Sequence, residues 1–83
     1  MEKIIIHLMV PALGLEYDMY IPTTILVSQL TKLIVQAIEE ITDKLYISSG
    51  NEILCLKEQD IILVQEAVIK SYAIQNGDHI MLI

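Results

Sequence analysis

Two histidines and one cysteine are the residues of this chain best suited to metal chemistry. His7 and His79 lie in apolar segments near the two ends of the chain, and Cys55 lies in an alternating apolar run. Histidine and cysteine are common zinc ligands. If the three segments are neighbouring strands, alternation places all three side chains on one face of a sheet. We expect no metal, because His79 begins its strand while His7 lies midway along its own, so a parallel pair would place them diagonally.

Other reactive residues give no catalytic pattern. A nucleophile needs a base within hydrogen-bonding reach, itself oriented by a third group, and the spacing around Cys55 or the serines provides no such set. A free cysteine in an apolar run usually packs as a small hydrophobe. Glu39, Glu40 and Asp43 lack the loop spacing of a calcium site and are expected to form a solvated helix end. The sequence therefore predicts neither an enzyme nor a bound cofactor.

Composition and charge restrict the remaining classes of function. The chain has 83 residues, of which 54% are hydrophobic, and its one cysteine excludes an internal disulfide. We expect a single domain, residues 1–83, that is held together by packing alone. Eleven acidic residues against five lysines give a net charge of −6, which argues against nucleic-acid binding and adsorption to anionic membranes. The apolar stretches are too short to span a bilayer, and no signal peptide is recognisable, so the expected location is the cytoplasm.

The elements that position these residues begin with two strands. The run Lys3–Val10 is apolar and rich in β-branched residues, and Leu15–Ile21 alternates between apolar and polar residues. The turn residues Pro11–Gly14 between them predict an antiparallel hairpin. Strand alternation then divides the side chains between two faces. The residues on the expected core face are Ile4, Ile6, Leu8, Val10, Leu15, Tyr17, Met19 and Ile21. The residues on the opposite face are Ile5, His7, Met9, Glu16, Asp18 and Tyr20.

After Pro22 the apolar period changes from two to 3.6 residues. This pattern predicts an amphipathic helix over Val27–Ile41, with Thr23, Thr24 or Ser28 as its N-terminal cap. Val35 lies off the apolar stripe and is expected to be exposed. The residues expected to be buried by the helix are Leu30, Ile34, Ala37, Ile38 and Ile41.

The second half of the chain predicts three short strands. Either residues 44–48, with Tyr46 outward, or residues 52–57 form the third strand, and an apolar run from Ile61 forms the fourth. A helical turn is expected over residues 67–71. Asn76-Gly77-Asp78 is a strong turn signal, and a last strand follows from His79, with Ile80 and Leu82 in the core.

The expected architecture is an α+β roll, in which one helix covers one face of a mixed five-stranded sheet and the first and last strands pair in parallel at the centre. The opposite sheet face would then be open, with an unusual number of apolar side chains. Contiguous exposed apolar patches often mark contact sites. The candidate partner-binding residues on this open sheet face are Ile5, His7, Met9, Met81 and Ile83.

Three features of the sequence resemble a known family over the whole chain. They are Tyr17, Asp18 and Pro22 in and after the second strand, the aliphatic helix Val27–Ile41, and the closing pattern Tyr72-x-Ile74-x-Asn76-Gly77-Asp78-x-Ile80-x-Leu82. Together they resemble the ubiquitin-like β-grasp proteins, and more narrowly the small YukD/EsaB proteins that accompany type VII (WXG-substrate) secretion systems in Gram-positive bacteria.

The resemblance implies a noncatalytic accessory or regulator of type VII secretion. Such a protein would dock its open sheet face or an edge strand onto a protein partner, a component of the secretion system, with no nucleic acid and no direct membrane insertion. Two alternatives remain. One is a ubiquitin-like modifier or sulfur carrier processed from a longer precursor, although the sequence contains no Gly-Gly pair and stops at Ile83. The other is a structural homodimer whose open faces cover each other.

Overall fold

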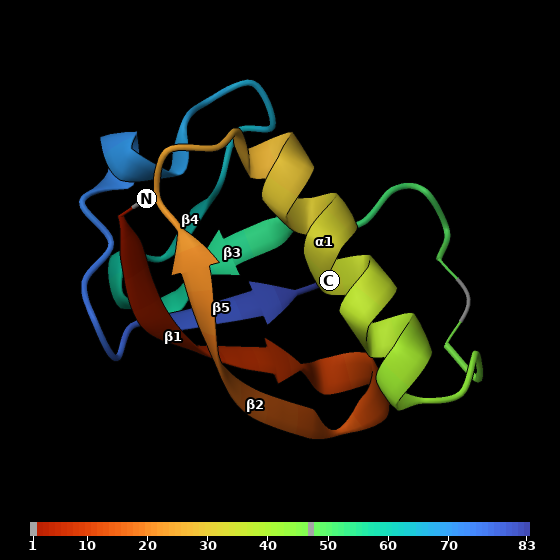
Figure 1. Cartoon of the computed structure of the whole chain (residues 1–83). Helices are drawn as coiled ribbons and strands as arrows, with labels where there is room; N and C mark the ends of the chain where they lie inside the picture. The colour runs from red at the N-terminus through yellow and green to blue at the C-terminus, as the bar shows by residue number, and fades with distance from the viewer. Residues whose placement is uncertain (1, 47) are drawn as a thin grey trace.

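The computed structural model describes residues 2–46 and 48–83, and within them one α-helix packs on one face of a five-stranded mixed sheet (Figure 1). The predicted fold class is therefore confirmed. The elements in chain order are β1 Lys3–Val10, β2 Leu15–Pro22, α1 Val27–Ile41, β3 Leu54–Leu56, β4 Ile61–Ile62 and β5 His79–Leu82. The strand order across the sheet is β2-β1-β5-β3-β4. Strands β1 and β5 are parallel and central, as expected, and the other three pairs are antiparallel.

The β1–β2 hairpin closes through the predicted turn. Pro11–Leu13 form one 3₁₀ turn, and Gly14 follows with φ of 64°, a left-handed conformation that glycine adopts without steric cost. The amide of Gly14 donates to the carbonyl of Pro11 at 3.2 Å. This turn sets the register of the hairpin, in which Val10 pairs with Leu15 and Lys3 with Pro22.

The turn before β5 sets the register at the centre of the sheet. The Asn76 side-chain oxygen accepts the amide of Ile5 at 2.9 Å, and the Gly77 amide donates to the Ile5 carbonyl. Strand β5 therefore begins its pairing halfway along β1, and His79 pairs directly with His7. The diagonal arrangement expected for the two histidines is wrong, because the side chain and backbone of the turn, not the strand ends, align β5.

The helix has the predicted bounds but a slightly different buried face. Ile34 and Ile38 are buried as expected, whereas Val35, expected to be exposed, is only 8% exposed. Val35 is sheltered because it lies beside the segment that returns from the helix toward β3. Ala37 is only half-buried, and Ile41 is 53% exposed because α1 ends there at the margin of the sheet (Figure 1).

The helix begins without the expected side-chain cap. Leu26 occupies the N-cap position, and its amide donates to the side-chain oxygen of Gln29 at 2.9 Å. The amides of Val27 and Ser28 donate to the carbonyls of Ala67 and Gln65 at 2.8 and 3.0 Å. Since these carbonyls satisfy amides that a helix start leaves unpaired, a Thr or Ser cap is not required.

The third strand lies in the second of the two predicted segments. β3 occupies Leu54–Leu56, while residues 44–46 and 48 are outside the sheet and residue 47 lies outside the described part of the chain. Tyr46 is half-buried against the core and does not point outward. The helical turn expected over residues 67–71 is a 3₁₀ turn at Ile69–Tyr72.

The core lies between α1 and the sheet, with a few half-buried residues at its margin. Ile6, Leu8, Ile80 and Leu82 are at most 2% exposed, as expected of the core face. Val10 and Ile21 are likewise buried, at 1% exposed each. The other residues expected on the core face of the hairpin pack against this core but are only half-buried: Ile4, Leu15, Tyr17 and Met19. Strand β2 is an edge strand, which leaves its core-facing side chains partly open to water.

Candidate functional site

The face of the sheet opposite α1 holds the predicted partner-binding residues. Ile5, His7 and Met9 alternate with buried residues along β1, and Met81 lies between buried residues of β5. Ile83 directly follows β5, is 60% exposed, and exchanges two 3.0 Å backbone hydrogen bonds with Ile53. Strand pairing brings three of the five together, because Met9 lies directly opposite Met81 and His7 lies two residues before Met9, opposite His79. We call this surface the open face.

One row of apolar side chains crosses four strands of the open face. Met9 pairs with Met81, Met81 with Cys55, and Cys55 with Ile62. Directly paired residues on one sheet face have Cβ atoms about 4.5 to 5.5 Å apart, so this row is contiguous. A shallow hollow of about 290 Å³ lies at the Cys55, Ile62 and Met81 end of the row. The row thus offers both an apolar surface and a recess for an inserted side chain.

Sequence reasoning missed two strongly exposed members of the open face. Tyr20 pairs with Ile5 and is 69% exposed, and Ile62 is 60% exposed. The alternation of β2 already placed Tyr20 outward, so the signal for it was present. No such signal existed for Ile62, because β4 has only two residues and its orientation depends on pairing with Cys55.

An ionic belt runs between the apolar residues of the open face. The His7 ring nitrogens lie 2.6 Å from Glu16 and 2.8 Å from Asp18, and His79 Nδ1 lies 2.5 Å from Glu58. The two imidazole rings meet edge to face with centroids 5.1 Å apart. We call these five residues the histidine belt.

The contacts of the histidine belt shift two pKa values in the directions that ion pairing predicts. The hydrogen bond to Glu16 is the main cause that raises the pKa of His7, and the bond to Asp18 adds to it. The His79 amide and ring both donate to Glu58 and lower the pKa of that carboxyl. The belt therefore places a histidine with a raised pKa among carboxylates in the middle of an otherwise apolar face.

The histidines and Cys55 do not form a metal centre in the described residues. Both ring nitrogens of His7 contact carboxylates, and Cys55 lies opposite Met81, not beside His79. In residues 2–46 and 48–83, no group of three or more His, Cys, Asp or Glu side chains has a metal-binding arrangement. That part of the chain also contains no helix with the length and apolar character needed to cross a membrane.

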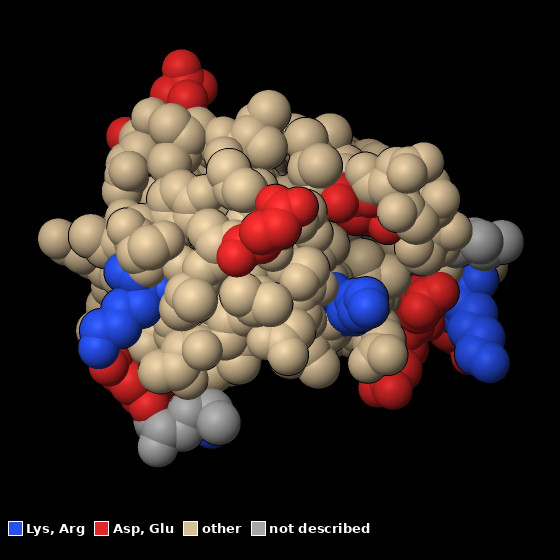
Figure 2. Space-filling view, turned by 90° about the horizontal axis from the view of Figure 1, so that it is seen from above, with Lys and Arg blue, Asp and Glu red and all other residues tan. Residues whose placement is uncertain are grey.

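Exposed apolar residues also occur away from the open face. Leu33 and Ile41 lie on α1, and Val64 and Val68 lie between β4 and the 3₁₀ turn. Seen from above, the charged side chains are scattered and wide uncharged areas separate them (Figure 2). The open face differs from these positions because strand pairing fixes its apolar residues in one continuous row.

Searches with the sequence identify no relative: no protein-family model matches it, and no curated protein is significantly similar. Solved structures are similar in fold. The ubiquitin-like (UBL) domain of Plasmodium falciparum Dsk2 has a TM-score of 0.75 and 20% identity, over 98% of this chain and 96% of that one. The ubiquitin-like domain of EccD5 from Mycobacterium xenopi has a TM-score of 0.71 and 15% identity, over 100% and 94%.

A third similar structure is a chain of the MycP5-free ESX-5 inner membrane complex. Its TM-score is 0.80 at 15% identity, and the match covers 98% of this chain but only 20% of that one. Together with the strand order, these similarities define the class of this protein: it has the ubiquitin-like β-grasp fold. At these identities they establish the fold alone, since one fold serves many functions.

Proposed function

We propose that this protein is a noncatalytic, cytoplasmic, ubiquitin-like accessory or regulator of a type VII secretion system. It binds a protein component of that system through the open face, with Ile5, His7, Met9, Met81 and Ile83 among the contacts. The YukD/EsaB resemblance of the sequence supports the secretion role. The fold shared with EccD5 and with a chain of the ESX-5 complex is consistent with it.

The apolar row Met9–Met81–Cys55–Ile62 is the observation that carries the binding role. These residues contribute nothing to the α1 side of the sheet, yet together they place apolar surface next to a recess. A partner side chain that fills the recess would remove this surface from water, at about 25 cal/mol per Å² of apolar area. Interfaces concentrate their energy in a few such central residues, and Met81 lies in the middle of the row.

Binding to a secretion component tests the proposal. The tagged chain is mixed with the soluble part of a membrane ATPase of the FtsK/SpoIIIE kind, encoded beside WXG-type proteins in the same genome, and Kd is measured by calorimetry. Met81→Glu should weaken binding about tenfold or more, the scale of a central interface residue. Leu33→Glu is the matched control, because Leu33 is 51% exposed on α1, away from the open face.

The outcomes separate the parts of the proposal. Wild-type chain that does not bind the ATPase part or the WXG-type proteins would contradict the secretion role. Equal weakening by both substitutions, or by neither, would contradict the open face as the contact surface. Light scattering tests the homodimer alternative. If the wild-type chain is a dimer and Met81→Glu converts it to a folded monomer, the occupant of the open face is a second copy of this chain and not a secretion component.

A further inference from the structure

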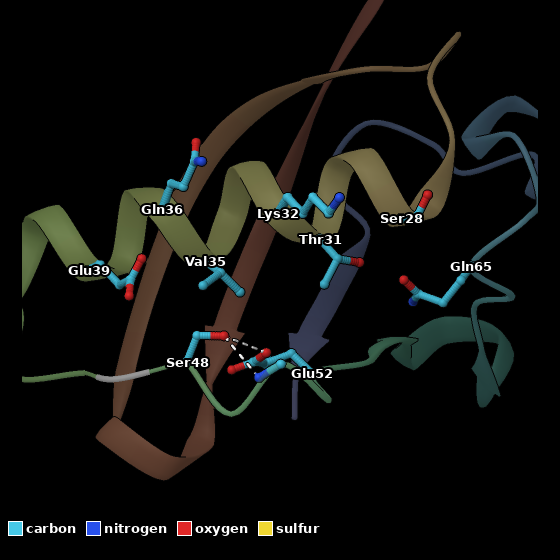
Figure 3. Close-up of a pocket in the computed structure, with 10 residues that line it drawn as sticks. Ser28, Thr31, Lys32, Val35, Gln36, Glu39, Ser48, Glu52 and Gln65 are labelled. Carbon is cyan, nitrogen blue, oxygen red and sulfur yellow. Dashed lines mark hydrogen bonds between the residues drawn. The ribbon is translucent and has the colours of Figure 1, made fainter.

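A cleft lined mostly by residues with polar side chains separates α1 from the segment that leads back to β3. Its volume is about 370 Å³, at the lower end of the range for ligand pockets, about 300 to 1,000 Å³. Thr31, Val35 and Glu39 of α1 line one side, and Ser48 and Glu52 line the other (Figure 3). The cleft lies on the helix side of the sheet, so it is separate from the open face.

Glu52 organises the far wall of the cleft. Its Oε2 atom accepts hydrogen bonds from the Tyr46 hydroxyl at 2.6 Å and the Ser49 amide at 2.9 Å, and Oε1 accepts one from the Ser48 hydroxyl at 2.9 Å. Burial raises the pKa of Glu52, but these hydrogen bonds outweigh it and lower the pKa to about 2. A carboxylate has about four acceptor positions, so Oε1 retains one for a further donor.

Gln65 supplies an unsatisfied donor in the same cleft. Its backbone carbonyl accepts the Ser28 amide at 3.0 Å, which fixes this residue beside the start of α1. Its side chain points into the cleft toward Thr31 and Glu52 (Figure 3). The buried Nε2 atom has no hydrogen-bond partner among the described residues. Since an unpaired buried donor costs about 1 to 3 kcal/mol, a ligand with an acceptor oxygen at this point would relieve that cost.

The charges of the cleft indicate what such a ligand carries besides an acceptor. Glu39 and Glu52 contribute two carboxylates and Lys32 one ammonium group, so the walls are net negative. We propose that the cleft binds a guanidinium or ammonium group together with a neighbouring carbonyl oxygen, as presented by a basic residue of a peptide. The cation lies between the carboxylates of Glu39 and Glu52, and the carbonyl accepts the Gln65 Nε2–H. This site is independent of the proposed function, and either can fail alone.

Titration of the ¹⁵N-labelled protein with small probes tests the site. Acetyl-arginine amide should give saturable shifts of the Gln65 side-chain amide and the Ser49 backbone amide. Acetyl-citrulline amide has the same shape without the charge and should bind about tenfold more weakly, because hydrogen bonds to charged groups are the stronger ones. Free arginine distinguishes the source of the ligand: tighter binding than acetyl-arginine amide would assign the site to a free amino acid.

Three variants complete the test. Glu39→Gln removes one carboxylate from the cleft without touching the hydrogen bonds to Glu52, and should weaken binding of acetyl-arginine amide several-fold. Gln65→Met should also weaken binding by a few-fold, while leaving the urea midpoint unchanged or higher, because it removes an unsatisfied donor. Asp60→Asn is the control, since Asp60 lies outside the cleft at φ of 54°, a conformation that asparagine tolerates.

Each of several results would overturn the site. Shifts that do not saturate mean that the cleft holds water only. Equal binding of the arginine and citrulline probes means that the carboxylates select no cation. Unchanged binding in both cleft variants, or equal weakening by Asp60→Asn, places the probe elsewhere on the protein.

Discussion

Replacing Ile34 by Ala should test the packing of α1 on the sheet most directly. Ile34 is 0% exposed at the centre of the helix and belongs to the buried cluster of the core. The substitution removes three carbon groups, each worth about 0.8 kcal/mol in transfer from water. The cavity that remains adds to this loss, so we expect destabilisation of about 3 to 4 kcal/mol. That is a large part of the total stability of a small domain, about 5 to 15 kcal/mol.

Urea unfolding monitored by circular dichroism measures the effect. With a slope of about 1 kcal/mol per M for a small protein, the midpoint should fall by about 3 M, or the variant should be unfolded without urea. Leu33→Ala is the matched control, because Leu33 is the neighbouring residue but is 51% exposed. Its midpoint should change by well under 1 M. Equal midpoints for the two variants would show that the buried face of α1 is assigned wrongly.

Two further predictions concern titration. Glu16→Gln should lower the pKa of His7 toward 6.5, as followed by NMR of the imidazole, because the hydrogen bond to Glu16 is the main cause of the raised value. Because the pKa of His7 is raised in the folded protein, its ion pair stabilises the fold fully below pH 6.5 and no longer above that raised pKa. The difference in unfolding free energy between wild type and variant should therefore shrink as pH rises through that range. A constant difference would contradict the ion pair. Tyr46→Phe should raise the pKa of Glu52 above about 2, as followed by carboxyl NMR, because it removes the hydroxyl donor. The contribution of Glu52 to the stability of the fold is present above pH 4.5 and is lost as the pH falls toward 2. If Tyr46→Phe left the pKa of Glu52 unchanged, the hydrogen bond from the Tyr46 hydroxyl would be contradicted.

The fold was predictable where one periodic pattern decided it. The bounds of α1 follow from the change of period after Pro22, and the hairpin follows from alternation on both sides of a Pro/Gly turn. The predictions were wrong where contacts with residues distant in the sequence, and not local sequence preferences, decide the structure. Val35 is buried by a segment that returns beside the helix, and the helix start is capped by carbonyls near residues 65–67 instead of a Thr or Ser side chain.

The candidate sites were predictable to a smaller extent. Strand alternation alone placed Ile5, His7 and Met9 on the open face, and the structure shows the same orientation. The direct pairing of His7 with His79 depends on contacts of the Asn76–Gly77 turn with Ile5, more than 70 residues earlier in the chain. The cleft beside α1 left no sequence signal at all, because it results from a folded connection with no periodicity.

The open face and the cleft would select their partners through different interactions. On the open face, apolar burial supplies the affinity, and the histidine belt adds a condition: protonation of His7, whose pKa is raised by Glu16 and Asp18, offsets part of the negative charge of these two carboxylates. A cationic partner group over the belt would therefore bind better above the pKa of His7 than below it. In the cleft, Glu52 stays ionised down to a pH of about 2, so recognition there should not change over the same range. Since a net charge of −6 attracts basic partners to both surfaces, pH is the variable that separates the two.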